Sequence, residues 1–181
     1  MPQRRATVER LGTFSDGVFA VIITIMVLEL KPPEHPTFAA LWSLWPTGLS
    51  YVVSYQFIAI VWLNHHHLLR FTDSATPRLI WINFVHLFMV SLVPFSTAWV
   101  ACTRLAAVPV FVYAGVFFLV ELAYLQFEHY ALSQAAEISH RARRIARIRS
   151  LIAFGLFLTG MLVSLKFPLC GFGLVCCAVL R

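Results

Sequence analysis

Long stretches without a charged residue are the feature that most limits what this 181-residue chain can fold into. Residues 37–69 and 79–103 contain no Asp, Glu, Lys or Arg, and shorter uncharged stretches follow at 105–120, 151–165 and 167–180. A helix needs about 20 apolar residues to cross a hydrocarbon core about 30 Å thick. Only 12% of the residues are charged, whereas about a quarter are charged in a soluble domain. We therefore expect an all-α, polytopic membrane protein.

The uncharged stretches and the apolar segment at the N-terminus together predict six transmembrane helices in a single domain, residues 1–181. The last two stretches are short, and the final one contains Pro168, Gly171 and Gly173. A kinked or re-entrant final segment, and with it a count of five spans, is the alternative. The predicted spans cover residues 8–31, 41–69, 79–102, 106–130, 149–165 and 167–181.

The distribution of Lys and Arg predicts the orientation in the membrane. With six spans, 11 of the 14 cationic residues fall on one side. Because cytoplasmic loops carry the excess of Lys and Arg, we expect both termini in the cytoplasm. The expected location is the cell (plasma) membrane. The residues on that side are Arg4, Arg5, Arg10, Arg70, Arg78, Arg141, Arg143, Arg144, Arg147, Arg149 and Arg181.

Two segments allow a second interpretation. A cleaved signal peptide is rejected because Asp16 and Glu29 interrupt the first apolar run and no small-residue cleavage site precedes Lys31. The basic sequence HRARRIARIR, residues 140–149, is interpreted as a cytoplasmic loop that extends two helices. A patch that binds nucleic acid or anionic lipid is its alternative. We expect membrane lipid, and no nucleic acid, among the partners.

Two acids in the first predicted helix suggest that it does more than face lipid. Only 12 residues lie between Asp16 and Glu29, about 18 Å of helix, so at least one carboxyl must sit at membrane depth. Such a charge is tolerated where it faces the bundle interior, a partner or a water-filled cavity. Capping of a helix that starts at Ser15 and Asp16 is the alternative.

One face of the same helix carries a stripe of residues three, four and seven positions apart, namely Val21, Thr24, Ile25 and Leu28. Asp16 precedes Val21 by five residues, which rotates it about 140° away from the stripe. The stripe and the acid therefore point to different environments. Plain core packing is the alternative interpretation of the stripe.

Three segments give the chain a recognisable signature. They read RLGTFSDGVFAVIITIMVLELK from Arg10, VWLNHHHLLRF from Val61 and LIWINFVHLFMVSLVPFSTAW from Leu79. In these segments the chain resembles prokaryotic members of the transmembrane protein 175 family, the endosomal and lysosomal potassium channels. The resemblance implies a cation channel with six spans per chain, assembled as a homotetramer, in which the first helix of each subunit lines a central pore. The chain has no filter loop of the TVGYG kind, in keeping with that family.

The resemblance also assigns roles to the stripe. It puts the narrow apolar ring at Val21, with Thr24, Ile25 and Leu28 below or beside it. Family members usually have isoleucine at the first ring, so Val21 departs from the pattern and predicts a wider constriction. The Thr24 hydroxyls are expected to form a ring of oxygens for a partly dehydrated K⁺, and Val21 or Leu28 to close the path by dewetting. K⁺ is the permeant ion, and no cofactor is expected.

A second group of residues receives a structural role from the resemblance, which is to tie the pore helix to the second and third spans. A buried carboxylate needs a cation or several hydrogen-bond donors, and His or Asn on a neighbouring helix supplies them. Asp16 is thus expected to hold the helix and not to contact the ion. The predicted signature motif and anchoring network comprises Arg10, Phe14, Ser15, Asp16, Trp62, His65 and Asn83.

Other chemistry finds little support in the sequence. No catalytic residues are predicted, because no nucleophile with its base and no paired acids stand out. No metal site is predicted, because His65, His66 and His67 point about 100° apart on a helix and the four cysteines lack CxxC spacing. His86 and Glu121 are interpreted as packed residues, with a polar network or a proton path as the alternative.

The rival functions are a proton-coupled secondary transporter or a proton-conducting channel that uses membrane Asp and His residues. A structural or assembly protein, with the stripe as a subunit contact, is the third.

Overall fold

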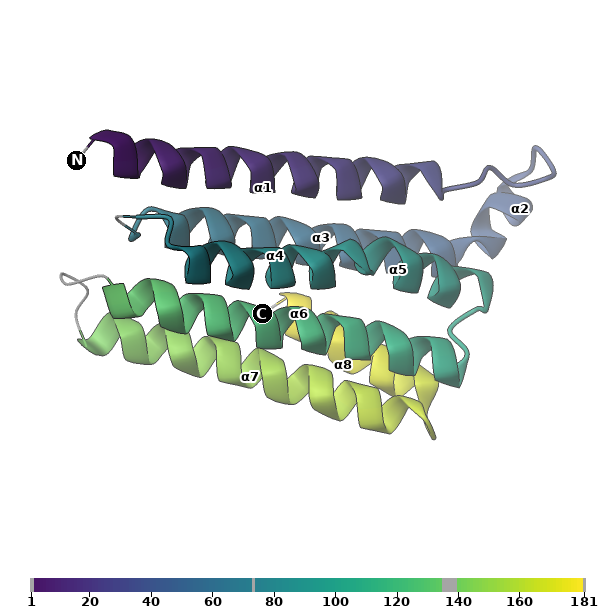
Figure 1. Cartoon of the computed structure of the whole chain (residues 1–181). Helices are drawn as coiled ribbons and strands as arrows, with labels where there is room; N and C mark the ends of the chain where they lie inside the picture. The colour runs from purple at the N-terminus through teal and green to yellow at the C-terminus, as the bar shows by residue number, and fades with distance from the viewer. Residues whose placement is uncertain (1, 73, 135–139, 181) are drawn as a thin grey trace.

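The computed structural model describes the backbone of residues 2–72, 74–134 and 140–180, and side chains within 7–72, 74–134, 144–145 and 147–180. In these residues all regular secondary structure is helical, and the long helices lie side by side as a bundle (Figure 1). The all-α prediction is confirmed. The helices are α1 (Pro2–Leu28), α2 (Phe38–Ser43), α3 (Trp45–Leu69), α4 (Pro77–Ser91), α5 (Val93–Cys102), α6 (Ala107–Gln134), α7 (His140–Ser164) and α8 (Pro168–Leu180).

Five helical segments in the described part of the chain are long and apolar enough to cross a membrane. They are Thr7–Leu28, Trp45–Leu69, Pro77–Cys102, Ala107–Gln134 and Arg147–Ser164. The sixth predicted span forms α8, an apolar helix of 13 residues. At 1.5 Å per residue α8 is about 20 Å long, which is shorter than a typical hydrocarbon core. This is the segment for which the sequence left a full crossing open.

Prolines and a capping threonine explain where the helices differ from the predicted spans. The second span begins at Trp45, behind the short helix α2, whose N-cap Thr37 accepts a hydrogen bond from the Ala40 amide. The third span divides at Leu92 into α4 and α5, with Pro94 in the first turn of α5. Proline lacks the N–H that a helix interior requires, so it is placed where that donor is not needed.

The last two helices, α7 and α8, pack closely because glycine lines their contact. A Cβ atom on Gly171 of α8 would lie 2.6 Å from Ser164 Cβ and 2.7 Å from the Gly160 carbonyl oxygen of α7. Small residues allow membrane helices to approach each other in this way. Gly171 therefore sets the distance between α8 and α7.

The arrangement of the helices leaves α1 at one edge of the bundle and α7 toward the other (Figure 1). α6 packs against α3, α4, α5, α7 and α8, whereas α1 packs against α3, α4 and α5. The core between them is aromatic, with the rings of Phe57 and Phe117 stacked at 3.9 Å. Within one chain α1 thus has a covered inner face and an outer face that none of the other helices described here covers.

Candidate functional site

The two faces of α1 have opposite environments. Its inner face packs into the bundle through side chains that are at most 8% exposed, spaced three or four positions apart: Leu11, Ser15, Phe19, Ile22 and Met26. The predicted stripe lies on the outer face. Val21 is 57%, Ile25 44% and Leu28 74% exposed, and Thr24 is exposed as well. The stripe is therefore not part of the core of this chain.

Thr24 combines exposure with a locally satisfied hydroxyl. Its Oγ1 donates a hydrogen bond to the Ala20 carbonyl oxygen at 2.9 Å. A hydroxyl that donates its proton to a backbone carbonyl still has oxygen lone pairs that can accept from, or coordinate, an external partner. Thr24 thus presents an oxygen acceptor between the apolar side chains of the stripe.

An apolar groove of about 890 Å³ runs beside the stripe, between α1 and α5. Val21 and Ile25 line it from α1, and Pro94, Phe95 and Ala98 line it from α5. Phe95 is 63% exposed. The uncovered apolar surface around the stripe therefore extends onto a second helix.

Asp16 and Phe14 each reach a neighbouring helix. Asp16 is partly buried, and its Oδ1 accepts a hydrogen bond from Trp62 Nε1 of α3 at 2.8 Å. The ring of Phe14 lies 5.5 Å from the ring of Phe84 of α4. The acid in the first helix thus has an indole donor as its partner.

A second set of contacts joins three helices inside the bundle. Asn83 Nδ2 of α4 donates to Ser15 Oγ of α1 at 3.1 Å, and Asn83 Oδ1 lies 2.6 Å from His65 Nε2 of α3. Because an amide oxygen only accepts, His65 carries its proton on Nε2 in this arrangement. All three side chains are fully buried. Arg10, in contrast, is exposed and makes no hydrogen bond or ion pair with another described residue.

His86 of α4 is the buried polar residue whose surroundings the sequence interpretation did not capture. It is fully buried, and its ring stacks on His65 at 5.9 Å with an angle of 6° between the planes. Neither of its ring nitrogens, nor His65 Nδ1, has a hydrogen-bond partner among the described residues. The spacing of three residues between Asn83 and His86 places both on one face of α4, which is the signal that could have linked them.

Among the described residues, no three His, Cys, Asp or Glu side chains lie close enough together to hold a metal ion. A helical bundle of membrane-length segments, with one uncovered helix held by buried polar contacts, defines a polytopic α-helical membrane protein. Its relatives specify the class further.

Comparison with known proteins assigns the family. The sequence model described as endosomal/lysosomal potassium channel TMEM175 matches residues 10–94. A protein named as a potassium channel from Chryseobacterium sp. (strain P1-3) is 34% identical over 165 residues, which cover 91% of this chain and 86% of that protein. One from Chamaesiphon minutus is 33% identical over 144 residues, covering 75% and 71%.

A mouse protein named as the endosomal/lysosomal proton channel TMEM175 is 28% identical over 100 residues, covering 49% of this chain and 20% of the mouse protein. The crystal structure of a lysosomal potassium-selective channel TMEM175 homologue from Chamaesiphon minutus superposes with a TM-score of 0.87, at 27% identity, covering 97% and 95% of the two chains. The chain belongs to the TMEM175 family of ion channels. The family resemblance inferred from the sequence is confirmed, and an enzymatic function is excluded with it.

Proposed function

We propose that the chain forms a potassium-selective, leak-type cation channel in which four copies surround a central pore lined by Val21, Thr24, Ile25 and Leu28. The observation that carries the proposal is the exposure of this stripe on α1 while the opposite face of the same helix is buried. A helix whose inner face is packed into its own subunit and whose outer face is exposed is suited to line an ion pathway shared by several subunits. The relatives named as potassium channels indicate the permeant ion.

Selection and gating in this proposal rest on rings of side chains. Leu28, the most exposed member of the stripe at 74%, forms an apolar ring that gates by dewetting. The Thr24 oxygens replace part of the hydration shell of K⁺. Valine at position 21 is one methylene smaller than isoleucine, so the upper ring of this chain is wider than an isoleucine ring.

The groove between α1 and α5 supports the assembly. In a tetramer around α1, the groove wall formed by Phe95, Pro94 and Ala98 faces the adjoining subunit. Membrane helices associate through close packing of such surfaces, since lipid tails are as apolar as the side chains. In the proposed tetramer a neighbouring subunit covers this groove. These contacts between subunits hold the four α1 helices around one axis.

The orientation proposed for the channel places both termini in the cytoplasm of a cell whose plasma membrane contains it. The start of α1, the end of α3, the end of α6 and the start of α7 lie at one end of the bundle (Figure 1). Arg10, Arg70 and Arg78 belong to this end, and the positive-inside rule assigns it to the cytoplasm. The other arginines invoked for this side include five whose side chains lie outside the described residues, namely Arg4, Arg5, Arg141, Arg143 and Arg181.

Proton conduction is the second candidate. It is favoured by the mouse relative named as a proton channel and by the buried pair His65 and His86, whose ring nitrogens Nδ1 of His65 and Nδ1 and Nε2 of His86 are without partners among the described residues. The two candidates differ in the ion that carries current.

Ion flux from liposomes tests the proposal. We expect the purified protein to release K⁺ faster than Na⁺, and Leu28→Ala to raise the leak or lower the preference for K⁺. Val27→Ala is the matched control, because Val27 is also exposed (47%) on α1 but lies about 100° from Leu28. A proton flux without K⁺ flux would favour the second candidate. A folded oligomer that passes neither ion would refute both.

A further inference from the structure

A groove of about 610 Å³ lies between α6 and α7, at the end of the bundle where α6 ends and α7 begins (Figure 1). Neither the proposed pore nor the anchoring network uses it. Residues of both helices line this α6–α7 groove, among them Arg144 and Arg147 from the second half of the basic sequence 140–149. The groove therefore gives part of that sequence a defined structural setting.

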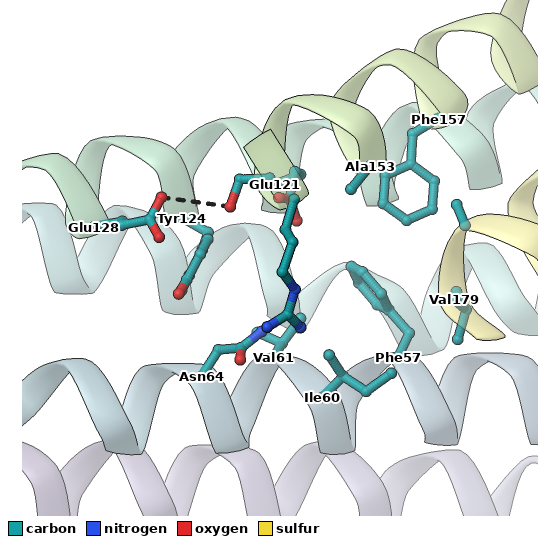
Figure 2. Close-up of a pocket in the computed structure, with 13 residues that line it drawn as sticks. Phe57, Ile60, Val61, Asn64, Glu121, Tyr124, Glu128, Ala153, Phe157 and Val179 are labelled. Atoms are coloured by element: carbon teal, nitrogen blue, oxygen red, sulfur yellow. Dashed lines mark hydrogen bonds between the residues drawn. The ribbon is translucent and has the colours of Figure 1, made fainter. Parts of the chain in front are cut away.

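A hydrogen bond beside the α6–α7 groove fixes how the two helices align. Ser150 Oγ of α7 donates to Glu128 Oε2 of α6 at 3.4 Å (Figure 2). Glu128 also lines a cavity of about 130 Å³ between α3, α6, α7 and α8 (Figure 2). α6 and α7 run in opposite directions (Figure 1). Residues after Glu128 on α6 therefore lie beside residues before Ser150 on α7, toward the end of the bundle.

The lining of the groove changes from polar at the end of the bundle to apolar toward its middle. Ser133 lies near the end of α6 and Arg144 near the start of α7, whereas Leu125 and Leu151 lie deeper. Leu151 follows Arg144 by seven residues, which is about 10 Å of helix. A phospholipid has the same order of polarity, because its charged headgroup stands at the membrane surface and its acyl chains extend below it.

The charges that line the groove favour an anion. The guanidinium groups of Arg144 and Arg147 and the carboxyl group of Glu128 line it, so the formal charge is +1 when these three are ionised and His129 is neutral. Arg147 and Arg149 both interact electrostatically with Glu128, so the acid is already compensated within the protein. Arg144 is exposed and makes no hydrogen bond or ion pair with another described residue. Its donors are therefore available to a ligand.

The spacing of Arg144 and Arg147 suits a phosphate group. Residues three positions apart share a face of a helix, so both side chains extend from the same side of α7. A guanidinium group binds phosphate oxygens through paired, charge-assisted hydrogen bonds. Because it has five N–H donors, Arg147 can serve Glu128 and a phosphate together. The orientation proposed above puts this end of the bundle at the cytoplasmic surface, where basic pockets between membrane helices bind anionic headgroups.

Apolar residues continue from the groove along α7. Ile148, Leu151 and Ile152 are each about half exposed. α7 lies toward the edge of the bundle away from α1 (Figure 1). In the tetramer proposed above, with α1 at the axis, this surface faces lipid. An acyl chain that leaves the groove would cover it.

Two other anions match the groove less well than a lipid does. Inorganic phosphate would leave Leu125 and Leu151 without a function. Proteins that bind single-stranded nucleic acid combine cations with aromatic side chains on which bases stack. No Phe, Tyr or Trp is among the described residues that line the groove.

We propose that the α6–α7 groove binds one anionic glycerophospholipid, with its phosphate between Arg144 and Arg147 and an acyl chain along Leu125 and Leu151. The two arginines select the charge, and the leucines require a ligand with an apolar tail. The proposal does not depend on which ion the channel conducts.

Native mass spectrometry of the detergent-purified full chain, titrated with lipid, tests the proposal. Dioleoyl phosphatidylglycerol is the probe. Dioleoyl phosphatidylcholine, which has the same acyl chains and no net charge, is the matched control. We expect one phosphatidylglycerol per chain, bound at least about fivefold more tightly than phosphatidylcholine, because the choline ammonium group would face the arginines. Equal affinities of the two lipids would overturn the proposal.

Competition separates the lipid from the other anions. Glycerol 3-phosphate carries the phosphate without acyl chains, and a short deoxythymidine oligomer stands for nucleic acid. Each should displace phosphatidylglycerol only at concentrations at least about tenfold higher, because neither buries an acyl chain. Displacement by glycerol 3-phosphate at equal concentration would assign the groove to a free phosphate, and displacement by the oligomer would assign it to nucleic acid. Either result would overturn the proposal.

Arginine variants locate the headgroup. Arg144→Gln and Arg147→Gln should each weaken phosphatidylglycerol binding about fivefold and leave phosphatidylcholine binding unchanged. Arg78→Gln is the matched control, because Arg78 is exposed at the same end of the bundle but lies on α4, outside the groove. Equal weakening in Arg78→Gln and Arg144→Gln would overturn the assignment, since the effect would then come from overall charge. Should Arg147→Gln not fold, Arg144→Gln decides by the same criterion.

Leucine variants locate the acyl chain. Leu151→Ser should weaken phosphatidylglycerol binding about threefold, because apolar contact area is lost. Leu162→Ser is the control, since Leu162 is similarly exposed on α7 (58%, against 53% for Leu151) but lies outside the groove. Equal affinities of the two variants would overturn the placement of the chain. Binding is measured without ion flux, so its result is separate from the test of the channel.

Discussion

Replacing Asn83 by alanine tests whether the buried contacts behind α1 hold the bundle together. Asn83 donates to Ser15 Oγ at 3.1 Å and accepts from His65 Nε2 at 2.6 Å, so Asn83→Ala removes both hydrogen bonds. It also leaves His65 with two unpaired ring nitrogens in the core, because His65 Nδ1 has no partner among the described residues.

The loss in free energy of unfolding follows from the two lost hydrogen bonds and from the His65 donor that is left without an acceptor. Interhelical hydrogen bonds in membrane proteins average about 0.6 kcal/mol, so two contribute about 1.2 kcal/mol. A buried donor left unpaired adds about 1–3 kcal/mol. The free energy of unfolding should fall by about 2–4 kcal/mol, which for a chain of this size lowers the melting temperature by roughly 5–15 °C.

Thermal unfolding in detergent, followed by circular dichroism, measures this shift. Ser91→Ala on the same helix is the control, since Ser91 is exposed and bonds only to the Phe88 carbonyl oxygen of its own helix. A shift for Asn83→Ala no larger than that of Ser91→Ala would refute the idea that these contacts carry stability. Equal stability of Asn83→Leu would show that shape, and not hydrogen bonding, matters at this position.

Three further predictions concern other parts of the molecule. Asp16→Ala should reduce the single oligomer peak in size-exclusion chromatography more than it changes ion selectivity. Asp16→Asn, which keeps an acceptor for Trp62, should preserve that peak. A normal oligomer with altered selectivity in Asp16→Ala would contradict this prediction. Gly171→Ala should lower the free energy of unfolding by about 1–3 kcal/mol, measured by thermal unfolding. Gly173→Ala should not, because a Cβ there meets no atom within 4 Å. Equal melting temperatures of the two variants would contradict the close approach of α8 to α7. Val21→Ile should reduce single-channel conductance by narrowing the upper ring; unchanged conductance would place the constriction elsewhere.

The membrane class and the positions of the long helices follow from the sequence because charge is excluded from a hydrocarbon core. Residues 37–69 and 79–103 show this, since uncharged runs of that length are rare in chains that fold in water. The break at Leu92 and the start of α3 at Trp45 are harder to predict from the sequence. Apolar runs continue through both points, and only the prolines beside them indicate a boundary.

The stripe on α1 is visible in the sequence as a periodic pattern, but periodicity does not tell which face of a helix is covered. Exposure of Val21 and burial of Phe19 distinguish the faces, and these depend on where α3 and α5 pack. The pairing of Trp62 with Asp16 came from the family resemblance and not from spacing, because the two residues are 46 positions apart. The cavity between α3, α6, α7 and α8 is lined by residues from four helices that are far apart in the sequence. No local sequence pattern therefore predicts it.

Chemical modification of a cysteine at position 28 tests the central claim most directly. In a variant whose four native cysteines are serine, Leu28→Cys should react with a positively charged methanethiosulfonate reagent, and K⁺ current through planar bilayers should fall, because the added charge stands in the pathway. Val27→Cys, modified to the same extent, should leave the current unchanged. Full modification of Leu28→Cys with no change in current would contradict the assignment of the α1 stripe to the pore.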